Sequence, residues 1–317
     1  MHSNDKGAVL ITGASGFLGT YIAEAYKQLR NPLLGIDYNP PREGIKWARF
    51  IMGPCESASL KTLLTEFNVA TVFHLAGGAS VPASVQLPFH DFSTSVPGTV
   101  KLLSEVVQHS PNVHLIFMSS AAVYGNPVCL PISEEAAVAP ISPYGIHKAM
   151  SELALREYAR VYDLKISILR VFSVFGPGLR KQLFWDLSQL AHKAHAKGER
   201  TIVLQGVGTE SRDFIFAKDV AKAALHIAHR VASSGFEIFN IGSGRETEIQ
   251  DAASQLITHL NLNIDLAFDG NVRPGVPRNW RADVTKLSES GFSPEVSFNE
   301  GIGLLATWLK NDYSSSS

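Results

Sequence analysis

Short apolar runs alternate with longer segments of helical periodicity along the first half of the chain. Strands buried on both faces are expected at Ala8–Thr12, Leu33–Asp37, Ala48–Met52, Thr71–His74, Val113–Met118 and Ile166–Arg170. Helices are expected between them, at Gly16–Arg30, Ala58–Phe67, Thr94–Gln108 and Tyr144–Tyr162. Such an alternation indicates parallel β-α-β units with right-handed crossovers. The pattern therefore predicts an α/β fold with a doubly wound parallel sheet, which binds ligands at the carboxyl ends of its strands.

The pattern changes after Phe175, where Gly176-Pro177-Gly178 interrupts the chain. A helix is expected at Gln182–Lys197, followed by a strand and helix within Asp213–Arg230 and a strand at Phe236–Ile241. We therefore expect the main sheet domain to span residues 1–175, with pieces returning at about 213–241. Residues 176–317 are then mainly a smaller C-terminal α/β lid.

Composition narrows the classes of function. The 317 residues are 45% hydrophobic and 18% charged, with a net charge of −1, which indicates a globular chain without a basic surface for nucleic acid. The longest apolar stretches are too short to span a membrane, and MHSNDKG does not resemble a signal peptide. The two cysteines, Cys55 and Cys129, lie far apart, so we expect a reducing, cytoplasmic environment and no metal site.

Three glycines occupy the first expected strand-to-helix turn, with the spacing GxxGxxG at Gly13, Gly16 and Gly19. The first permits a tight turn, the second lets the backbone approach a pyrophosphate, and the third allows close helix–strand packing. The pyrophosphate would lie at the free N–H groups of the helix. Asp37 ends the next strand, where its carboxylate can accept the ribose hydroxyls of NAD and repel the extra phosphate of NADP. A dinucleotide, NAD rather than NADP, is the predicted cofactor.

A tyrosine and a lysine, Tyr144 and Lys148, are four residues apart and so share one helical face. A neighbouring ammonium lowers the pKa of a phenol, so this pair can exchange a proton with a substrate, although the same spacing also occurs in surface pairs. The strand before this helix ends in Ser119 and Ser120. We expect Ser120 to bond a substrate oxygen and Ser119 to face the cofactor or the backbone.

Several longer motifs occur in a fixed order: TGASGFLG, FHLAGGAS, FMSSAAVYG, SPYGIHK, LRVFSVFGPG, GTESRDFIFAKDV and FNIGSG. With them the chain resembles the extended short-chain dehydrogenase/reductases, in particular the NAD-dependent sugar-nucleotide epimerase/dehydratase group, from about Ala8 to about Leu309. The resemblance implies a Rossmann-type NAD(P)-binding domain, a substrate-binding lid and a homodimer formed by Thr94–Gln108 and Tyr144–Tyr162.

The resemblance also assigns residues. It implies that Ser120, Tyr144 and Lys148 are catalytic, with Ser120 bonding the sugar oxygen and Tyr144 acting as acid and base. The cofactor residues it implies are Gly13, Ser15, Gly16, Phe17, Leu18, Asp37, Leu75, Ala76, Gly77, Ser95, Ser119, Tyr144 and Lys148. The substrate residues it implies are Ser120, Ser173, Arg212 and Arg278.

Departures from the family pattern restrict the reaction. Dehydratases of this group carry Asp-Glu after the catalytic hydroxyl, where this chain has Ala121 and Ala122, which cannot transfer a proton. Neither Cys55 nor Cys129 matches the acid/base cysteine of the 3,5-epimerising reductases. C4 epimerisation of a nucleotide-activated sugar, in the manner of a UDP-glucose 4-epimerase, is preferred, and 4-keto reduction uses the same residues. A dinucleotide sensor without catalysis is disfavoured because all three catalytic residues are present.

Other departures concern binding. Pro54 stands where the family has an adenine-binding Asp, and Ser95 and Ser173 stand where it has Asn. The family pattern favours a diphosphate contact over an ion pair for Arg212, and the segment Arg273–Arg278 resembles a second phosphate-binding stretch.

We expect three further polar residues to have structural roles. We expect His74 to be a hydrogen-bonded histidine at a strand end, and Asp219 to anchor a helix. His147 is expected to be a solvent-facing helix residue.

Overall fold

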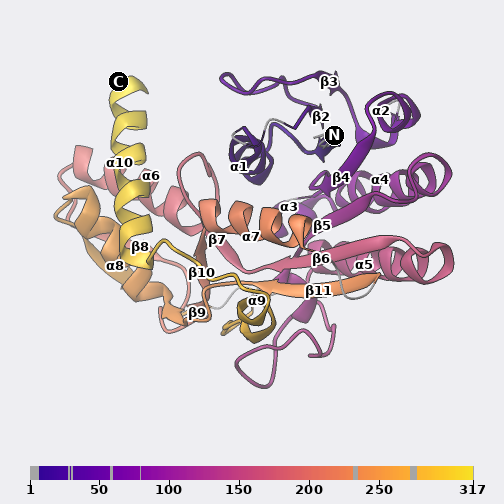
Figure 1. The fold of residues 1–317 in the computed structure, drawn as a ribbon. Helices are drawn as coiled ribbons and strands as arrows, with labels where there is room; N and C mark the ends of the chain where they lie inside the picture. Colours follow the sequence, from indigo (N-terminus) through magenta and orange to yellow (C-terminus); the bar gives the residue numbers. More distant parts are fainter. Residues whose placement is uncertain are drawn as a thin grey trace. The chain divides into compact units, whose positions relative to one another are not determined.

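A seven-stranded sheet forms within the described residues (Figure 1). The structure is a computed structural model that describes residues 7–27, 29, 31–57, 60–78, 80–230, 235–271 and 277–316. The strands, in order across the sheet, are β11 (Phe236–Ile241), β6 (Lys165–Val171), β5 (His114–Ser120), β4 (Val69–His74), β1 (Ala8–Thr12), β2 (Leu33–Asp37) and β3 (Arg49–Met52). Pairing from β3 to β6 is parallel throughout, which confirms the predicted doubly wound fold. The strand order reverses at β1 and β4, where such sheets bind ligands.

Helices pack on this sheet because its strands are apolar on both faces. The helices of this part of the chain are α1 (Phe17–Tyr26), α2 (Leu60–Glu66), α3 (Val81–Gln86), α4 (Pro88–His109), α5 (Pro143–Tyr162) and α7 (Ala217–His229), with short 3-10 turns η1 (Cys55–Ser57) and η2 (Ala121–Tyr124). Val72 faces the core shared with α2, α4 and α5. The next residue, Phe73, points to the other face, where its ring lies 5.6 Å from that of Tyr26 in α1. The alternation of side chains along a strand produces these two packed layers.

The described residues fall into two compact units. The first comprises Met1–Gly125, Glu134–Val171 and Ala221–Asn240, and the second comprises Asn126–Ser133, Phe172–Val220 and Ile241–Ser317. The strands of the second unit are β7 (Ser173–Phe175), β8 (Thr201–Leu204), β9 (Ser211–Arg212), β10 (Phe214–Phe216), β12 (Thr247–Glu248) and β13 (Asp265–Phe268). Its helices are α6 (Gln182–Ala196), α8 (Ile249–Leu260), α9 (Thr285–Glu289) and α10 (Phe298–Ser316), and α7 begins in it. Its core contains leucine, isoleucine and alanine side chains and a cluster of phenylalanines around Phe175.

Two boundaries differ from those expected in ways that matter for the site. Helix α4 begins at Pro88 rather than at Thr94, and Pro97 lies inside it. Pro88 fits the first position of a helix, but Pro97 removes a hydrogen bond from the interior. The polar turns before Pro97 were therefore hard to recognise as helix. Strand β5 continues to Ser120, so both serines of its end lie on the strand itself.

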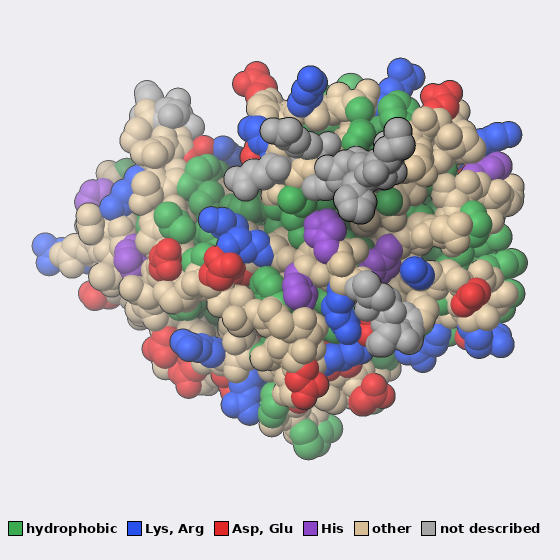
Figure 2. Space-filling model, viewed as in Figure 1, with side chains coloured by type: hydrophobic (Ala, Val, Ile, Leu, Met, Phe, Trp, Pro, Cys, Tyr) green, Lys and Arg blue, Asp and Glu red, His purple; other side chains and the backbone are tan. Residues whose placement is uncertain are grey.

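Charged side chains of both signs are interspersed on the face shown in Figure 2. This agrees with the net charge of −1. Within the described residues, no helix is long and apolar enough to cross a membrane.

Candidate active site

The turn between β1 and α1 has the geometry that its glycines predict. Gly13 adopts a φ of +72°, and a Cβ atom on it would lie 3.0 Å from the backbone nitrogen of Ala76. A Cβ atom on Gly19 would lie only 2.2 Å from the carbonyl oxygen of Gly13, so helix and turn pack without room for a side chain. Within the described residues, no side chain caps α1 at Gly16. The first N–H groups of α1 can therefore bind an anion such as a pyrophosphate.

Asp37 lies at the carboxyl end of β2, against the same turn. Its Oδ2 accepts the backbone N–H of Ser15 at 3.0 Å, and its Oδ1 accepts that of Asn39 at 2.8 Å. Asn39 Nδ2 also donates to Oδ1 at 3.3 Å. These bonds orient the carboxylate beside the glycine turn and leave Oδ2 a further lone pair. The arrangement fits an acceptor for ribose hydroxyls. Ser15, Phe17 and Leu18 belong to the same turn and the start of α1.

A second backbone segment, Leu75–Gly78, follows β4 and lies next to the glycine turn. The N–H groups of Leu75 and Ala76 both donate to Thr12 Oγ1, each at 3.2 Å. Ser95 Oγ of α4 accepts the N–H of Gly78 at 2.8 Å. Ser95, where the family has Asn, therefore holds this segment in place through its backbone.

His74 ends β4 beneath this segment. Its Nδ1 lies 2.7 Å from Thr12 Oγ1 and its Nε2 lies 3.0 Å from Thr99 Oγ1, and its side chain is buried. Burial, with a smaller effect of the Lys148 charge, lowers the pKa of His74 to about 3, so the ring is neutral. The prediction of a hydrogen-bonded strand-end histidine is confirmed.

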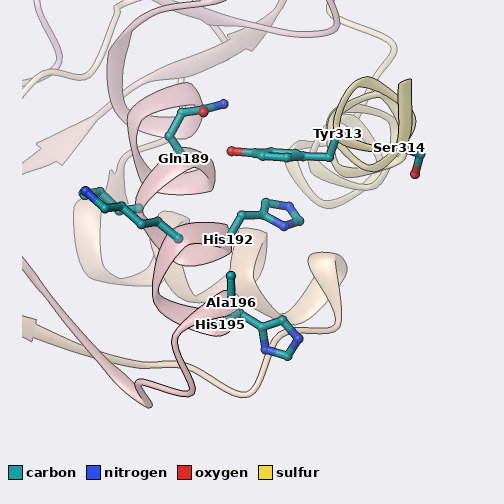
Figure 3. Close-up of a pocket in the computed structure, with 8 residues that line it drawn as sticks. Gln189, His192, His195, Ala196, Tyr313 and Ser314 are labelled. Atoms are coloured by element: carbon teal, nitrogen blue, oxygen red, sulfur yellow. The ribbon is translucent and has the colours of Figure 1, made fainter. Parts of the chain in front are cut away.

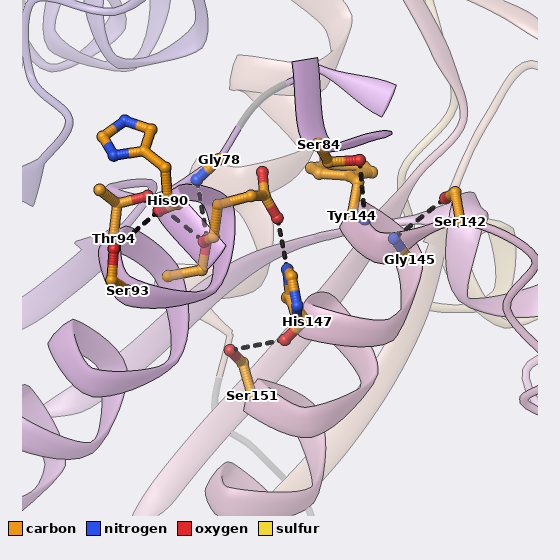
Figure 4. Close-up of polar contacts among 12 residues, drawn as sticks. Gly78, Ser84, His90, Ser93, Thr94, Ser142, Tyr144, Gly145, His147 and Ser151 are labelled. Carbon is orange, nitrogen blue, oxygen red and sulfur yellow. Dashed lines mark hydrogen bonds and ion pairs between the residues drawn. The ribbon is translucent and has the colours of Figure 1, made fainter. Parts of the chain in front are cut away.

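The predicted acid/base residues lie on the first turns of α5. Ser142 caps this helix by accepting the N–H of Gly145 at 3.2 Å, and Pro143 occupies its first turn. Ser84 Oγ of α3 accepts the N–H of Tyr144 at 3.0 Å (Figure 4). Lys148 is buried, donates from Nζ to the carbonyl oxygen of Met118 at 2.9 Å, and lies 5.9 Å from the centroid of the Tyr144 ring. The structure therefore brings the pair to the carboxyl end of β5.

Burial dominates the ionisation of Tyr144. Desolvation raises its pKa to about 12, a hydrogen bond with Ser120 opposes this rise, and the charge of Asp91 adds to it. The spacing alone led us to expect a lowered pKa, but burial raises it instead. At neutral pH Tyr144 therefore carries its proton and can donate it.

The two serines at the end of β5 face opposite sides. Ser120 Oγ accepts the N–H of Ala122 at 3.2 Å and bonds the Tyr144 hydroxyl. Ser119 is buried, and its hydroxyl donates to Glu152 Oε1 of α5 at 2.5 Å. The prediction that the Ser119 side chain faces the cofactor or the backbone does not hold, because the alternation along β5 places it with Phe117 on the face that α5 covers.

His147 is not solvent-facing, and the expectation for this residue was wrong. Its Nδ1 lies 2.6 Å from Asp91 Oδ2 of α4, and both side chains are buried. His147 faces α4 because α4 and α5 pack side by side. The spacing of residues within one helix cannot reveal this packing. Sequence reasoning singled out neither Asp91 nor Glu152, since neither belongs to a short motif.

Three of the predicted substrate residues, Ser173, Arg212 and Arg278, lie in the second unit. Arg212, at the end of β9, donates from Nη1 to the carbonyl oxygens of Ser211 and Arg278, at 2.7 and 3.0 Å. Its guanidinium also lies 5.6 Å from the ring centroid of Trp280, a residue that the motifs did not indicate. Burial lowers the pKa of Arg212 to about 10, so it keeps its charge at neutral pH.

The other members of this set are held through their backbones. The N–H of Arg278 donates to Asn126 Oδ1 at 2.8 Å, and its side chain is exposed. The N–H of Ser173, on β7, donates to the carbonyl oxygen of Asp213 at 2.9 Å. Residues 272–276, which hold most of the predicted phosphate-binding segment Arg273–Arg278, lie outside the described residues. Asp219 is buried and accepts the N–H of Val296 at 3.0 Å, which confirms its anchoring role.

A surface groove of about 730 Å³ lies between α6 and α10 of the second unit (Figure 3). The rings of His192 and Tyr313 stack in it with centroids 3.6 Å apart. None of the predicted site residues lines it, so we assign it no ligand. Among the described residues, no group of three or more His, Cys, Asp or Glu side chains is arranged to hold a metal ion.

Comparison with known proteins agrees with this geometry. Residues 9–242 match the NAD dependent epimerase/dehydratase family. A UDP-glucose 4-epimerase of Mycolicibacterium smegmatis is 30% identical over 95% of this chain and 98% of its own.

Two solved structures are similar throughout. MoeE5 in complex with UDP-glucose and NAD is 31% identical, with a TM-score of 0.85 over 97% of this chain and 100% of its own. The UDP-glucuronic acid 4-epimerase of Bacillus cereus, in complex with UDP-glucuronic acid and NAD, is 27% identical, with a TM-score of 0.86 over 96% of this chain and 100% of its own. The chain therefore belongs to the NAD-dependent epimerase/dehydratase family.

Proposed function

We propose that this protein is an NAD-dependent C4 epimerase of a nucleotide-activated sugar. The observation that carries the proposal is the position of Tyr144 and Lys148 on one turn of α5 at the carboxyl end of β5, where Lys148 Nζ bonds the carbonyl oxygen of Met118 and Ser120 ends the strand. The glycine turn and Asp37, at the same edge of the sheet, fit NAD. The similar proteins act on UDP-glucose and UDP-glucuronic acid, which favours UDP as the carrier.

In this function the protein residues bind and orient the sugar and the cofactor, and they move one proton. Held by the glycine turn and Asp37, NAD would supply a hydride acceptor and donor for C4 of the sugar and, in its oxidised form, a positive charge. Ser120 orients the C4 hydroxyl, and Tyr144 takes its proton and later returns it. Lys148, held by the carbonyl oxygen of Met118, stabilises the phenolate and binds the ribose beside it. Ala121 and Ala122 bring no group that exchanges a proton at C5, so the reaction stops at epimerisation.

A 4-ketoreductase would use the same three residues, and the fate of the cofactor separates the two reactions. An epimerase regenerates NAD in each cycle, whereas a reductase consumes NAD(P)H. Mass spectrometry of the nucleotide released from freshly purified, denatured protein, followed by incubation with UDP-glucose and UDP-glucuronic acid, tests the choice. Isomerisation without added cofactor supports the epimerase. Reduction of 4-keto sugars only with added NAD(P)H would establish the reductase instead.

The tyrosine provides the control for this experiment. We expect Tyr144→Phe to lower kcat by about 100-fold or more, because it removes the acid/base group. Tyr162→Phe, at an exposed position at the end of the same helix, is the matched control and is expected to keep full activity. Full activity of Tyr144→Phe would refute the assignment of Tyr144. Absence of turnover in the parent protein would instead favour a dinucleotide sensor.

Arg212 is the proposed diphosphate contact. A planar guanidinium binds two phosphate oxygens at once, and its Nη1 bonds to two carbonyl oxygens orient it for that task. Arg278, with its exposed side chain, and Ser173 are proposed as further contacts. Arg212→Lys keeps the charge and loses the planar fork, so we expect a higher KM for the nucleotide sugar with a smaller change in kcat.

We also propose that the protein is a homodimer through α4 and α5. Apolar side chains of α5 at positions 146, 150 and 153 are 44%, 42% and 62% exposed, and they follow helical spacing along one face. Exposed apolar side chains in such a row favour a second copy of the chain. Sedimentation is expected to show a dimer that Leu153→Asp dissociates, and a monomer at micromolar concentration would contradict the proposal.

A further inference from the structure

A buried polar row on α4 faces the segment that follows β4. Asp91 and Ser95 lie one helical turn apart and are 6% and 5% exposed. Ser95 Oγ accepts the N–H of Gly78, and a Cβ atom on Gly78 would lie 1.8 Å from Asp91 Oδ1. The carboxylate therefore packs directly on the backbone of Gly78, and a side chain at this position would displace it. Through these two residues, α4 fixes the segment Leu75–Gly78.

The same carboxylate reaches the catalytic helix. His147 lies between Tyr144 and Lys148 on α5, and its ring points toward α4, where Nδ1 meets Asp91 Oδ2 at 2.6 Å (Figure 4). The ring of Phe92 packs edge-on against the imidazole, with centroids 5.6 Å apart. A buried carboxylate without a donor is costly, so each partner depends on the other. Asp91 thus joins the segment after β4 to the turn that carries Tyr144 and Lys148.

The carboxylate also acts on Tyr144 through its charge. The groups that act on the phenol are the Ser120 hydroxyl of β5 and the Asp91 carboxylate of α4, and Lys148 of α5 lies 5.9 Å from the ring centroid. His74 is held neutral by burial, and Lys148 is the cation of the predicted catalytic set. The negative charge of Asp91 raises the pKa of Tyr144. Removing that charge should therefore make Tyr144 easier to ionise.

We propose that Asp91 and His147 are positioning residues of the Tyr144/Lys148 site, and that the Asp91 carboxylate tunes proton transfer by Tyr144. The proposal rests on the proposed function, in which Tyr144 is the acid and base. Their hydrogen bond holds the first turn of α5 on α4, and the carboxylate opposes formation of the phenolate. The family resemblance in the motifs does not include this pair.

Two variants of each residue separate geometry from charge. Asp91→Asn keeps an acceptor for His147 and removes the charge, whereas Asp91→Ala removes both. His147→Asn keeps a donor near the position of Nδ1, whereas His147→Ala removes it. Glu157→Gln, an exposed carboxylate on α5, and His114→Asn, a histidine that bonds Ser167, are matched controls expected to behave as the parent protein.

The first readout is the pH profile of kcat for epimerisation. In Asp91→Asn the lost negative charge lowers the pKa of Tyr144, so the rising limb of kcat should move to lower pH by about 0.5 to 1 unit. Asp91→Ala and His147→Ala should lose about tenfold or more in kcat with KM changed by about twofold or less, because the reacting groups are displaced while substrate contacts remain. His147→Asn should recover most of the kcat lost in His147→Ala.

The second readout does not need a substrate. Hydrogen–deuterium exchange of the amides in residues 143–150 should increase in Asp91→Ala and stay near the parent level in Asp91→Asn. Superimposable pH profiles of Asp91→Asn and the parent protein, or parent-level kcat and exchange in Asp91→Ala, would overturn the inference. If the parent protein turns over no nucleotide sugar, the proposed function fails, and the exchange comparison then decides the positioning role by itself.

Discussion

Replacing Glu152 by glutamine should destabilise the first unit strongly, because it breaks a buried ion pair. Arg170 and Glu152 are 1% and 5% exposed. Arg170 donates from Nη2 to Glu152 Oε2 at 2.8 Å, and its Nη1 donates to the hydroxyl of Tyr124 at 2.9 Å. Glu152 Oε1 also accepts the hydroxyl of Ser119 at 2.5 Å. The Glu152 carboxylate therefore balances the charge of the Arg170 guanidinium, which is buried away from water.

Glutamine has a similar shape but no charge, so Glu152→Gln leaves Arg170 buried and uncompensated. Removing one partner of such a pair costs about 3–5 kcal/mol of stability. Glu157→Gln on the same helix is the matched control: its pair with Arg160 has side chains 47% and 71% exposed, and its loss should cost less than about 0.5 kcal/mol.

Equilibrium unfolding in urea at pH 7, followed by circular dichroism, measures both variants. A loss of less than about 1 kcal/mol in Glu152→Gln would refute the reasoning, since it would mean that Arg170 finds water or another partner at no cost. Equal losses in Glu152→Gln and Glu157→Gln would refute it as well, because burial would then make no difference.

Three further changes have defined outcomes. His74 should make the protein acid-sensitive, because its pKa falls from 6.5 to about 3 on folding. Between these two pH values the unfolded chain binds a proton that the folded protein does not. The free energy of unfolding should therefore drop by about 1.4 kcal/mol for each pH unit below 6.5. Unfolding at pH 7 and pH 5 should therefore show a smaller difference in His74→Gln than in the parent protein. Gly19→Ala should cost about 1–3 kcal/mol, measured by thermal unfolding, because its Cβ would meet the carbonyl oxygen of Gly13; unchanged stability would contradict this. Asp37→Asn should weaken NAD binding by about tenfold or more in calorimetry, since an amide is a poorer acceptor for ribose hydroxyls than a carboxylate; unchanged affinity would exclude Asp37 from the cofactor site.

Much of the main sheet was predictable because its strands are continuous apolar runs. The bounds of β1 and β2 agree with those expected, and the glycine turn between β1 and α1 follows from its spacing. The Tyr144–Lys148 turn was predictable for a similar reason: a helical period of four residues and a capping Ser142 are local features.

Features that depend on packing between elements were not predictable. The burial of His147 depends on which face of α5 meets α4, and the orientation of Ser119 depends on where β5 ends. Asp91 belongs to no short sequence motif, yet it contacts Gly78 and His147, which lie in two other segments. The high pKa of Tyr144 likewise comes from burial, which spacing does not reveal. Local sequence therefore indicated the candidate reacting groups, and tertiary packing determined their environment.

The most direct test of the account follows the hydrogen at C4. UDP-glucose carrying deuterium at C4 is incubated with the purified protein without added cofactor, and the product is analysed by NMR and mass spectrometry. The account predicts UDP-galactose that retains the deuterium at C4, because the hydride leaves and returns within one active site. Conversion that requires added NAD to oxidise C4 and added NADH to reduce it again, so that hydrogen replaces the deuterium, would contradict epimerisation within one active site.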